Sequence, residues 1–206
     1  MKKSLLFLLP LAMLTLTGCD KNKGGSEEEK LPDIVLDYTI FDGQTLSGSS
    51  TYYAAFDFVR EGVTFATGEG QDVGLAAART GEQHGYNDNH IMQIRAAVGF
   101  IRTKTECPAK SIEVKWWTTY STQDDSTYFP QAKAGEDANY GSYTTVAINE
   151  ATPLSGVEVT GVKQGEGDGF QCYEYTTTYT LPQGTTFFSV GAGAGAAYVK
   201  SITIKR

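Results

Sequence analysis

The sequence predicts an all-β protein, an antiparallel β-sandwich in a single domain, and two observations lead to this prediction. After residue 18 the chain contains 23 threonines but only six leucines. Threonine favours strands, whereas leucine is a strong helix former. From Asp33 onward, apolar and polar residues alternate in short runs, and clusters rich in glycine and asparagine separate the runs. Such clusters are typical of tight turns between strands.

The alternating runs define ten expected strands, and no helical segments of 10–15 residues intervene, which disfavours a parallel α/β sheet. The expected strands cover residues 34–40, 62–67, 73–79, 90–96, 111–120, 143–148, 157–162, 172–181, 185–190 and 197–205. Residues 33–206 are enough for one substantial core. We therefore expect one β-sandwich domain over 33–206.

Alternation also predicts which side chains face the core. In the run 111–120, Ile112, Val114, Trp116 and Tyr120 share one face, while Trp117 shares the other with Glu113 and Lys115. Because its neighbours on that face are charged, we expect Trp117 to be exposed. The ladder Tyr173, Tyr175 and Tyr179 is expected to face the core. In the last strand the same rule puts Tyr198, Lys200, Ile202 and Ile204 on one face, which leaves Lys200 unexplained there unless the strand lies at an edge.

The N-terminus has the layout of a secretory signal. Lys2 and Lys3 precede an apolar stretch at 5–16, which is too short to span a bilayer core of about 30 Å comfortably. The stretch ends in Leu16-Thr17-Gly18-Cys19, where small residues precede a cysteine. An ordinary cleaved signal with an incidental cysteine is the alternative interpretation.

The segment 16–19 resembles the lipobox of bacterial lipoproteins. The resemblance implies that residues 1–18 are removed as a lipoprotein signal peptide and that Cys19 is acylated, which provides stable membrane anchorage. The protein would then lie in the cell envelope, anchored by lipid alone, on the surface or the periplasmic face of an outer membrane.

Residues 19–32 are expected to be a flexible acidic tether, since Asp20–Lys30 contains no apolar side chain. The acidic run Glu27–Glu29 resembles the export tracts of some surface lipoproteins, although a solvated spacer explains it equally well. Asp20 instead resembles an inner-membrane retention signal, so the membrane leaflet stays open. The formal net charge of the whole chain is −7, which argues against nucleic acid as a partner.

The end of the chain resembles jelly-roll, galactose-binding-like modules. Its glycine-rich stretch at 191–196 is followed by the strand Ala197-Tyr198-Val199-Lys200-Ser201-Ile202-Thr203-Ile204. Such modules often close with an aromatic, an aliphatic and an x-I-x-I strand. The resemblance covers some ten residues and implies a jelly-roll-like sandwich, but a fold alone does not define a function.

With Cys19 acylated, Cys107 and Cys172 remain as a pair. An oxidising compartment makes a disulfide between them plausible, and closing the loop would stabilise the fold by about 4 kcal/mol. Two separate buried thiols are the alternative.

We expect no catalytic residues and no cofactor. Metal binding is an alternative hypothesis that the sequence favours less. Calcium favours oxygen ligands from glycine-rich loops, and Asp88 and Asp168 are the candidates for it. His84 and His90 flank a glycine- and asparagine-rich loop without helical zinc spacing, so a small metal-assisted hydrolase is the least favoured function.

Aromatic side chains outside the core suggest a glycan partner, because sugar C–H faces stack on rings while sugar hydroxyls form hydrogen bonds. The predicted contact residues are Trp117, Tyr128, Tyr86 and Asp88. The sequence therefore predicts a non-catalytic, carbohydrate-binding envelope protein. The alternative is a structural or adaptor lipoprotein that binds another envelope protein through a sheet edge or an aromatic patch.

Overall fold

The computed structural model describes residues 30–44, 53–68, 78–80, 91–118, 122–123, 129–149, 154–155, 157–162 and 169–206. Residues Leu31–Arg206 form one compact unit. The described part has two 3-10 turns, η1 (Tyr38–Phe41) and η5 (Tyr140–Ser142), and none of its helices is long and apolar enough to cross a membrane.

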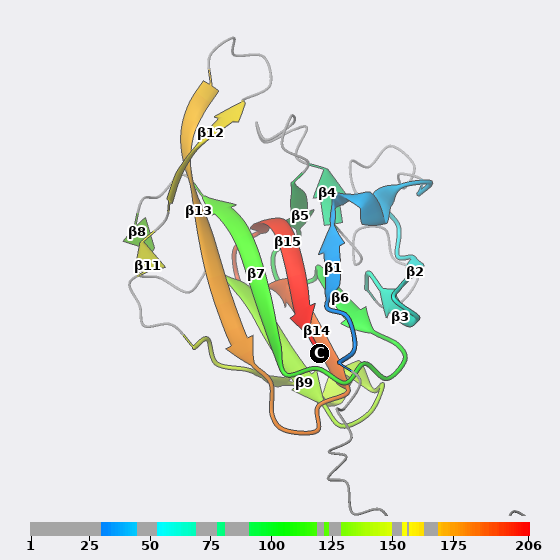
Figure 1. Ribbon diagram of the computed structural model, residues 1–206. Coiled ribbons are helices and arrows are strands. Elements are labelled where there is room, and N and C mark those ends of the chain that lie inside the picture. Colours follow the sequence, from blue (N-terminus) through cyan, green and yellow to red (C-terminus); the bar gives the residue numbers. More distant parts are fainter. Residues whose placement is uncertain are drawn as a thin grey trace, which may run out of the picture. The chain divides into compact units, whose positions relative to one another are not determined.

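Two antiparallel sheets make up the domain (Figure 1). The seven-stranded sheet consists of β1 (Ile34–Asp37), β4 (Ala78–Thr80), β5 (Met92–Ile94), β7 (Ser111–Thr118), β12 (Val157–Val162), β13 (Gly169–Thr180) and β15 (Ala197–Lys205). The six-stranded sheet consists of β2 (Asp57–Arg60), β3 (Val63–Ala66), β6 (Phe100–Thr103), β9 (Pro130–Gly135), β10 (Thr144–Thr145) and β14 (Phe187–Ala192). A short separate pair is formed by β8 (Thr122–Gln123) and β11 (Leu154–Ser155).

The strand order of the seven-stranded sheet is β12-β13-β7-β15-β5-β4. Strand β1 also pairs with β15, on the same edge as β5 but nearer the C-terminal end of β15. The other sheet runs β10-β9-β14-β6-β3-β2. Neighbours in these orders pair antiparallel, so the expected all-β antiparallel sandwich is confirmed. In Figure 1, β13, β7, β15 and β1 lie side by side in front of β9, β14 and β6.

One hydrophobic core lies between the sheets, because their inner faces belong to a single cluster of buried side chains. Trp116 is a buried member of this core, stacked on Tyr175 with ring centroids 4.8 Å apart and tilted against Phe129 at 5.2 Å. Tyr175 and Tyr179 are both 2% exposed, which confirms the expected core face of the tyrosine ladder. The alternation predicted for β7 is confirmed as well, since Ile112, Val114 and Trp116 point inward.

A β-bulge in β15 corrects the face predicted for the last strand. Val199 and Ser201 pair with consecutive residues of β7, so Lys200 is an extra residue between them. The extra residue reverses the alternation, and both Val199 and Ile202 consequently point into the core. Lys200 therefore does not share a face with Ile202, and its side chain lies on the outer face of the sheet.

Strand β1 is shorter than the predicted run 34–40. The Asp37 carboxylate accepts hydrogen bonds from the Thr39 backbone N–H at 3.0 Å and from the Thr39 hydroxyl at 2.6 Å. These local bonds cap η1 and compete with strand pairing. The chain therefore leaves the sheet after Asp37 and turns across its edge.

Candidate functional site

Most of the predicted contact residues lie outside the described residues, namely Tyr86, Asp88, Tyr128 and the second calcium candidate Asp168. The same is true of Cys19, His84 and His90. In the part of the chain that the structure does describe, no group of three or more His, Cys, Asp or Glu side chains could hold a metal ion. Trp117 is thus the predicted contact whose surroundings can be analysed.

Trp117 lies on the outer face of the seven-stranded sheet, as its neighbours predicted, but the expectation that it is exposed is wrong. Only 5% of the residue is accessible. Its indole N–H donates a hydrogen bond of 2.9 Å to Glu174 Oε2, from the paired position on β13. The Lys200 ammonium lies 5.7 Å from the centroid of its ring system. An outward direction on a sheet is therefore not the same as access to solvent.

Two neighbouring cross-strand rows of outward-facing residues lie at and beside Trp117 on the seven-stranded sheet. Paired positions on β15, β7 and β13 place Tyr198, Trp117 and Glu174 in one row. The next row runs from β1 to β7 and contains Asp37, Ser201 and Lys115. Because residues in one cross-strand row face the same side, the register alone brings these distant parts of the sequence together.

Glu174 from the first row and all three residues of the second row line a cleft of about 600 Å³. Its lining consists of Asp37, Tyr38, Thr39, Asp42, Lys115, Glu174, Lys200 and Ser201. The strands supply a rigid base, while η1 and the residues that flank it supply one wall. Arg60 of β2 braces that wall, since its guanidinium donates to the Thr39 carbonyl at 3.1 Å. Binding groups on such a supported scaffold keep their geometry.

The cleft is polar, and it has an aromatic ring in its lining. Three carboxylates and two ammonium groups face it together with two hydroxyls, and Tyr38 contributes the phenol. Tyr38 is itself half-buried and packs edge-on against Phe41, with centroids 5.9 Å apart. Glu174 and Asp37 both accept bonds from the fold, and a carboxylate has further acceptor positions for a ligand. The arrangement can therefore accept and donate several hydrogen bonds around a small polar ligand.

The predicted disulfide between Cys107 and Cys172 is wrong in this structure. Cys107 carries a free, fully buried thiol, and burial raises the pKa of this thiol. Cys107 precedes the start of β7, whereas Cys172 lies one pair beyond Thr118 at its other end. Eight residues of strand separate the two ends of β7 by roughly 26 Å. A disulfide requires a distance of only about 4.4–6.8 Å between the two Cα atoms. The sheet register keeps the two cysteines apart.

Comparison with known proteins identifies no family, since no family model and no curated protein matches the chain. Six solved chains resemble it in structure. One is the K2 cleaved adhesin domain of Lys-gingipain (Kgp), with a TM-score of 0.34 and 16% identity, covering 89% of this chain and 94% of that one. Another is the mannan-recognising carbohydrate-binding module TmCBM27, with a TM-score of 0.36 and 10% identity, covering 84% of this chain and 95% of that one. The function proposed below is based on this chain's own cleft.

Proposed function

We propose that this chain is a non-catalytic binding protein that holds a glycan in the cleft on the outer face of its seven-stranded sheet. The observation that supports this most directly is the lining of the cleft, where carboxylates, ammonium groups and hydroxyls surround a space that Tyr38 borders. Its volume of about 600 Å³ lies within the range of small-ligand sites, about 300–1,000 Å³. Sugar hydroxyls match such donors and acceptors, and a phenol ring suits the C–H face of a pyranose.

Trp117 has a supporting role in this proposal and does not contact the sugar. Its covered ring carries Lys200 on one side and holds Glu174 by the indole N–H. Both charged groups line the cleft. Substituting Trp117 would therefore weaken binding through the positions of these two side chains, and Tyr38 replaces Trp117 as the expected stacking residue.

A polysaccharide panel in affinity gel electrophoresis tests the proposal, followed by calorimetry on any glycan that retards the full chain. We expect Tyr38→Ala to weaken binding at least about fivefold, which corresponds to about 1 kcal/mol, the loss typical of an important contact residue. Tyr140→Ala is the matched control, since it removes a half-buried tyrosine that lies against the other sheet. The proposal fails if no glycan retards the chain, or if both variants weaken binding equally.

We also propose that the protein is anchored to the cell envelope through an acylated Cys19, on the basis of the lipobox-like segment at 16–19. The test is metabolic labelling with an alkyne fatty acid, followed by mass spectrometry of the N-terminal peptide. We expect label on the wild-type chain and none on Cys19→Ser. A labelled Cys19→Ser chain, or an unlabelled wild-type chain, contradicts the anchor.

The alternative role, as an adaptor for another envelope protein, is favoured by one observation. Leu31, Val35 and Val59 are 42%, 51% and 58% exposed, and two of them belong to the contacting strands β1 and β2. Crosslinking in intact cells compares the wild type with the double variant Val35→Ser, Val59→Ser. A crosslinked partner that disappears in the variant would support the adaptor role, whereas an unchanged pattern contradicts it.

A further inference from the structure

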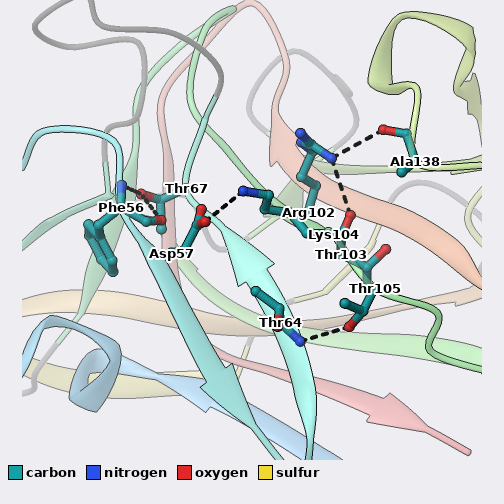
Figure 2. Close-up of polar contacts among 9 residues, drawn as sticks. All are labelled: Phe56, Asp57, Thr64, Thr67, Arg102, Thr103, Lys104, Thr105 and Ala138. Atoms are coloured by element: carbon teal, nitrogen blue, oxygen red, sulfur yellow. Dashed lines mark hydrogen bonds and ion pairs between the residues drawn. The ribbon is translucent and has the colours of Figure 1, made fainter.

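Surface carboxylates in this protein differ in whether a lysine offsets their charge. On the six-stranded sheet, the Asp57 carboxylate forms an ion pair of 2.6 Å with the Lys104 ammonium, and Figure 2 shows the two side chains pointing toward each other. Asp33, which precedes β1, is paired in the same way with Lys205, at 2.9 Å. In both places a neighbouring cation balances the negative charge.

The three carboxylates that line the cleft are arranged differently. Asp37 accepts its two hydrogen bonds from uncharged groups of Thr39, and Glu174 accepts its bond from the uncharged indole of Trp117. The Asp42 side chain is exposed, and its carboxylate forms no hydrogen bond with any residue in the described ranges. Among those residues, no ion pair offsets any of the three carboxylates, although two lysines line the same cleft.

Strand pairing separates the lysines from the wall that η1 and its flanking residues form. Ser201 of β15 pairs with Asp37 of β1 on one side and with Lys115 of β7 on the other. The backbones of the two charged residues are therefore roughly 10 Å apart, two strand spacings. The Lys200 ammonium lies 5.7 Å from the ring centroid of the outer-face tryptophan, which is also on β7. The cationic side of the cleft is thus toward β7, and its acidic wall begins at β1.

The wall offers carboxylate oxygens that the fold itself does not use. Both bonds from Thr39 reach Oδ1 of Asp37, which fixes this carboxylate and leaves Oδ2 as an acceptor. Asp42 is held through its backbone N–H, which donates to the Thr39 carbonyl at 3.2 Å, so its side chain is available. Arg60 also bonds to Thr39, at the carbonyl and the hydroxyl, and it does not line the cleft.

We propose that this wall binds the ammonium group of an amino sugar, so that the glycan in the cleft contains hexosamine units whose amine is not acetylated. The inference rests on the proposed glycan-binding function for the choice of a sugar, and the cleft itself is the site. The wall carboxylates Asp37 and Asp42 supply the choice of a cation, since an ammonium donates up to three hydrogen bonds and charge-assisted bonds are the stronger ones. The ring of Tyr38, which lies between them in the sequence, also attracts a cation near its face.

The rest of the cleft suits the uncharged part of such a unit. Lys115 and Ser201 can donate hydrogen bonds to sugar hydroxyls, and Glu174 can accept them. An acidic sugar fits the wall poorly, because Asp37 and Asp42 would repel its carboxylate. A neutral sugar would leave both wall carboxylates without a charged partner. The arrangement therefore favours a cationic sugar over the other two classes.

Calorimetry of the full chain with a glucosamine oligomer, and with the N-acetylated oligomer of the same length, tests the inference. The measurement is made at low ionic strength and at about pH 5.5, where the amines are protonated. We expect the glucosamine oligomer to bind about fivefold more tightly, as for one or two partly exposed charge contacts. Added salt should reduce this difference, because it screens exposed charges.

Asp42→Asn removes one wall charge and nearly preserves the shape of the side chain. We expect it to weaken binding of the glucosamine oligomer about threefold to fivefold and to change binding of the N-acetylated oligomer less than about twofold. Asp42→Glu restores the charge and should restore the preference. Since the Asp42 carboxylate forms no bond with the described part of the fold, both variants should fold like the wild type.

Glu136→Gln is the matched control, because a chain of net charge −7 attracts any polycation at long range. Glu136 is exposed, follows the last residue of β9 on the other sheet and does not line the cleft. It changes the net charge by the same amount as Asp42→Asn, yet it should leave binding nearly unchanged. Equal weakening by Glu136→Gln and Asp42→Asn overturns the proposal, as does equal binding of the two oligomers by the wild type.

Three further outcomes separate the parts of the inference. If an oligolysine peptide displaces the glucosamine oligomer and loses as much affinity in Asp42→Asn, the wall takes ammonium groups of proteins and the sugar assignment is overturned. If neutral glycans bind the cleft and the glucosamine oligomer is not preferred, this inference fails while the proposed function stands. If no glycan of either kind binds, the proposed function fails and the inference fails with it.

Discussion

The hydrogen bond between Trp117 and Glu174 should contribute measurably to the free energy of unfolding, because it joins paired positions of β7 and β13 and its acceptor is charged. Replacing Trp117 with Phe keeps a ring on the outer face but removes the indole N–H, which donates to Glu174 Oε2 at 2.9 Å. Hydrogen bonds to charged groups contribute about 1.5–3 kcal/mol. Since Glu174 is half-buried and solvent replaces part of the bond, we expect the lower end, about 1.5 kcal/mol.

The smaller ring adds a second loss. Phe covers less apolar surface than Trp, and a loss of some 20–40 Å² costs about 0.5–1 kcal/mol. The total for Trp117→Phe is therefore about 2 kcal/mol. For a domain of this length, that lowers Tm by roughly 4–8 °C.

A double-mutant cycle with Glu174→Ala isolates the bond from the loss of surface. The chain has two tryptophans, so Trp117→Phe leaves buried Trp116 as the only indole, and its fluorescence reports urea unfolding of every variant that carries the substitution. We expect a coupling energy of about 1–1.5 kcal/mol. A coupling below about 0.5 kcal/mol, the range within which independent sites add, would refute the bond as a stabilising element.

Three other predictions concern packing and titration. Gly135→Ala should lower the free energy of unfolding by about 1–3 kcal/mol, because the added Cβ would lie 2.5 Å from Tyr143 Cε1. Gly141→Ala is the control, since its Cβ would lie 3.5 Å from the nearest atom, and it should unfold at nearly the wild-type urea concentration. In a thiol-reagent assay without reductant, Cys107 should react slowly in the native chain, and both Cys107 and Cys172 should react in denaturant. If neither thiol reacts in denaturant, the two cysteines form a disulfide and the prediction is wrong. Burial raises the pKa of Cys107, so above about pH 8.5 the thiol ionises in the unfolded chain before it does in the folded one. The free energy of unfolding should therefore fall as pH rises, and less steeply in Cys107→Ala; equal slopes would contradict this linkage.

Several elements were predictable from the sequence because they follow from local alternation. The inward face of β7 and the core position of Tyr175 and Tyr179 are examples. Strands β2, β6 and β9 and the short strands β8 and β11 were missed. The segment Pro130–Gly135 has alanines, a lysine and a glycine, which are poor strand formers, and it is a strand because it pairs with β14 and β10. Sheet pairing by distant partners overrides weak propensity.

The candidate site was predictable only in part. Trp117 was correctly assigned to the outer face but wrongly expected to be exposed, since it is only 5% accessible, bonds to Glu174 and lies beside Lys200. The short spacing of Asp37 and Thr39 is a local signal that could have indicated η1, because such side chains cap turns. No comparable signal marks the bulge at Lys200, which is defined by pairing with β7.

The sequence by itself determined the β-rich class, the core-facing sides of the clearest strands and the lipobox-like N-terminus, all of which depend on composition or on near neighbours in the chain. Only the tertiary structure decided which outward side chains meet. Trp117 and Glu174 are 57 residues apart in the chain, and Lys104 and Asp57 are 47 apart. Register across a sheet depends on pairings between such distant segments. The cleft, the covered tryptophan and the separated cysteines therefore became visible only once those pairings were known.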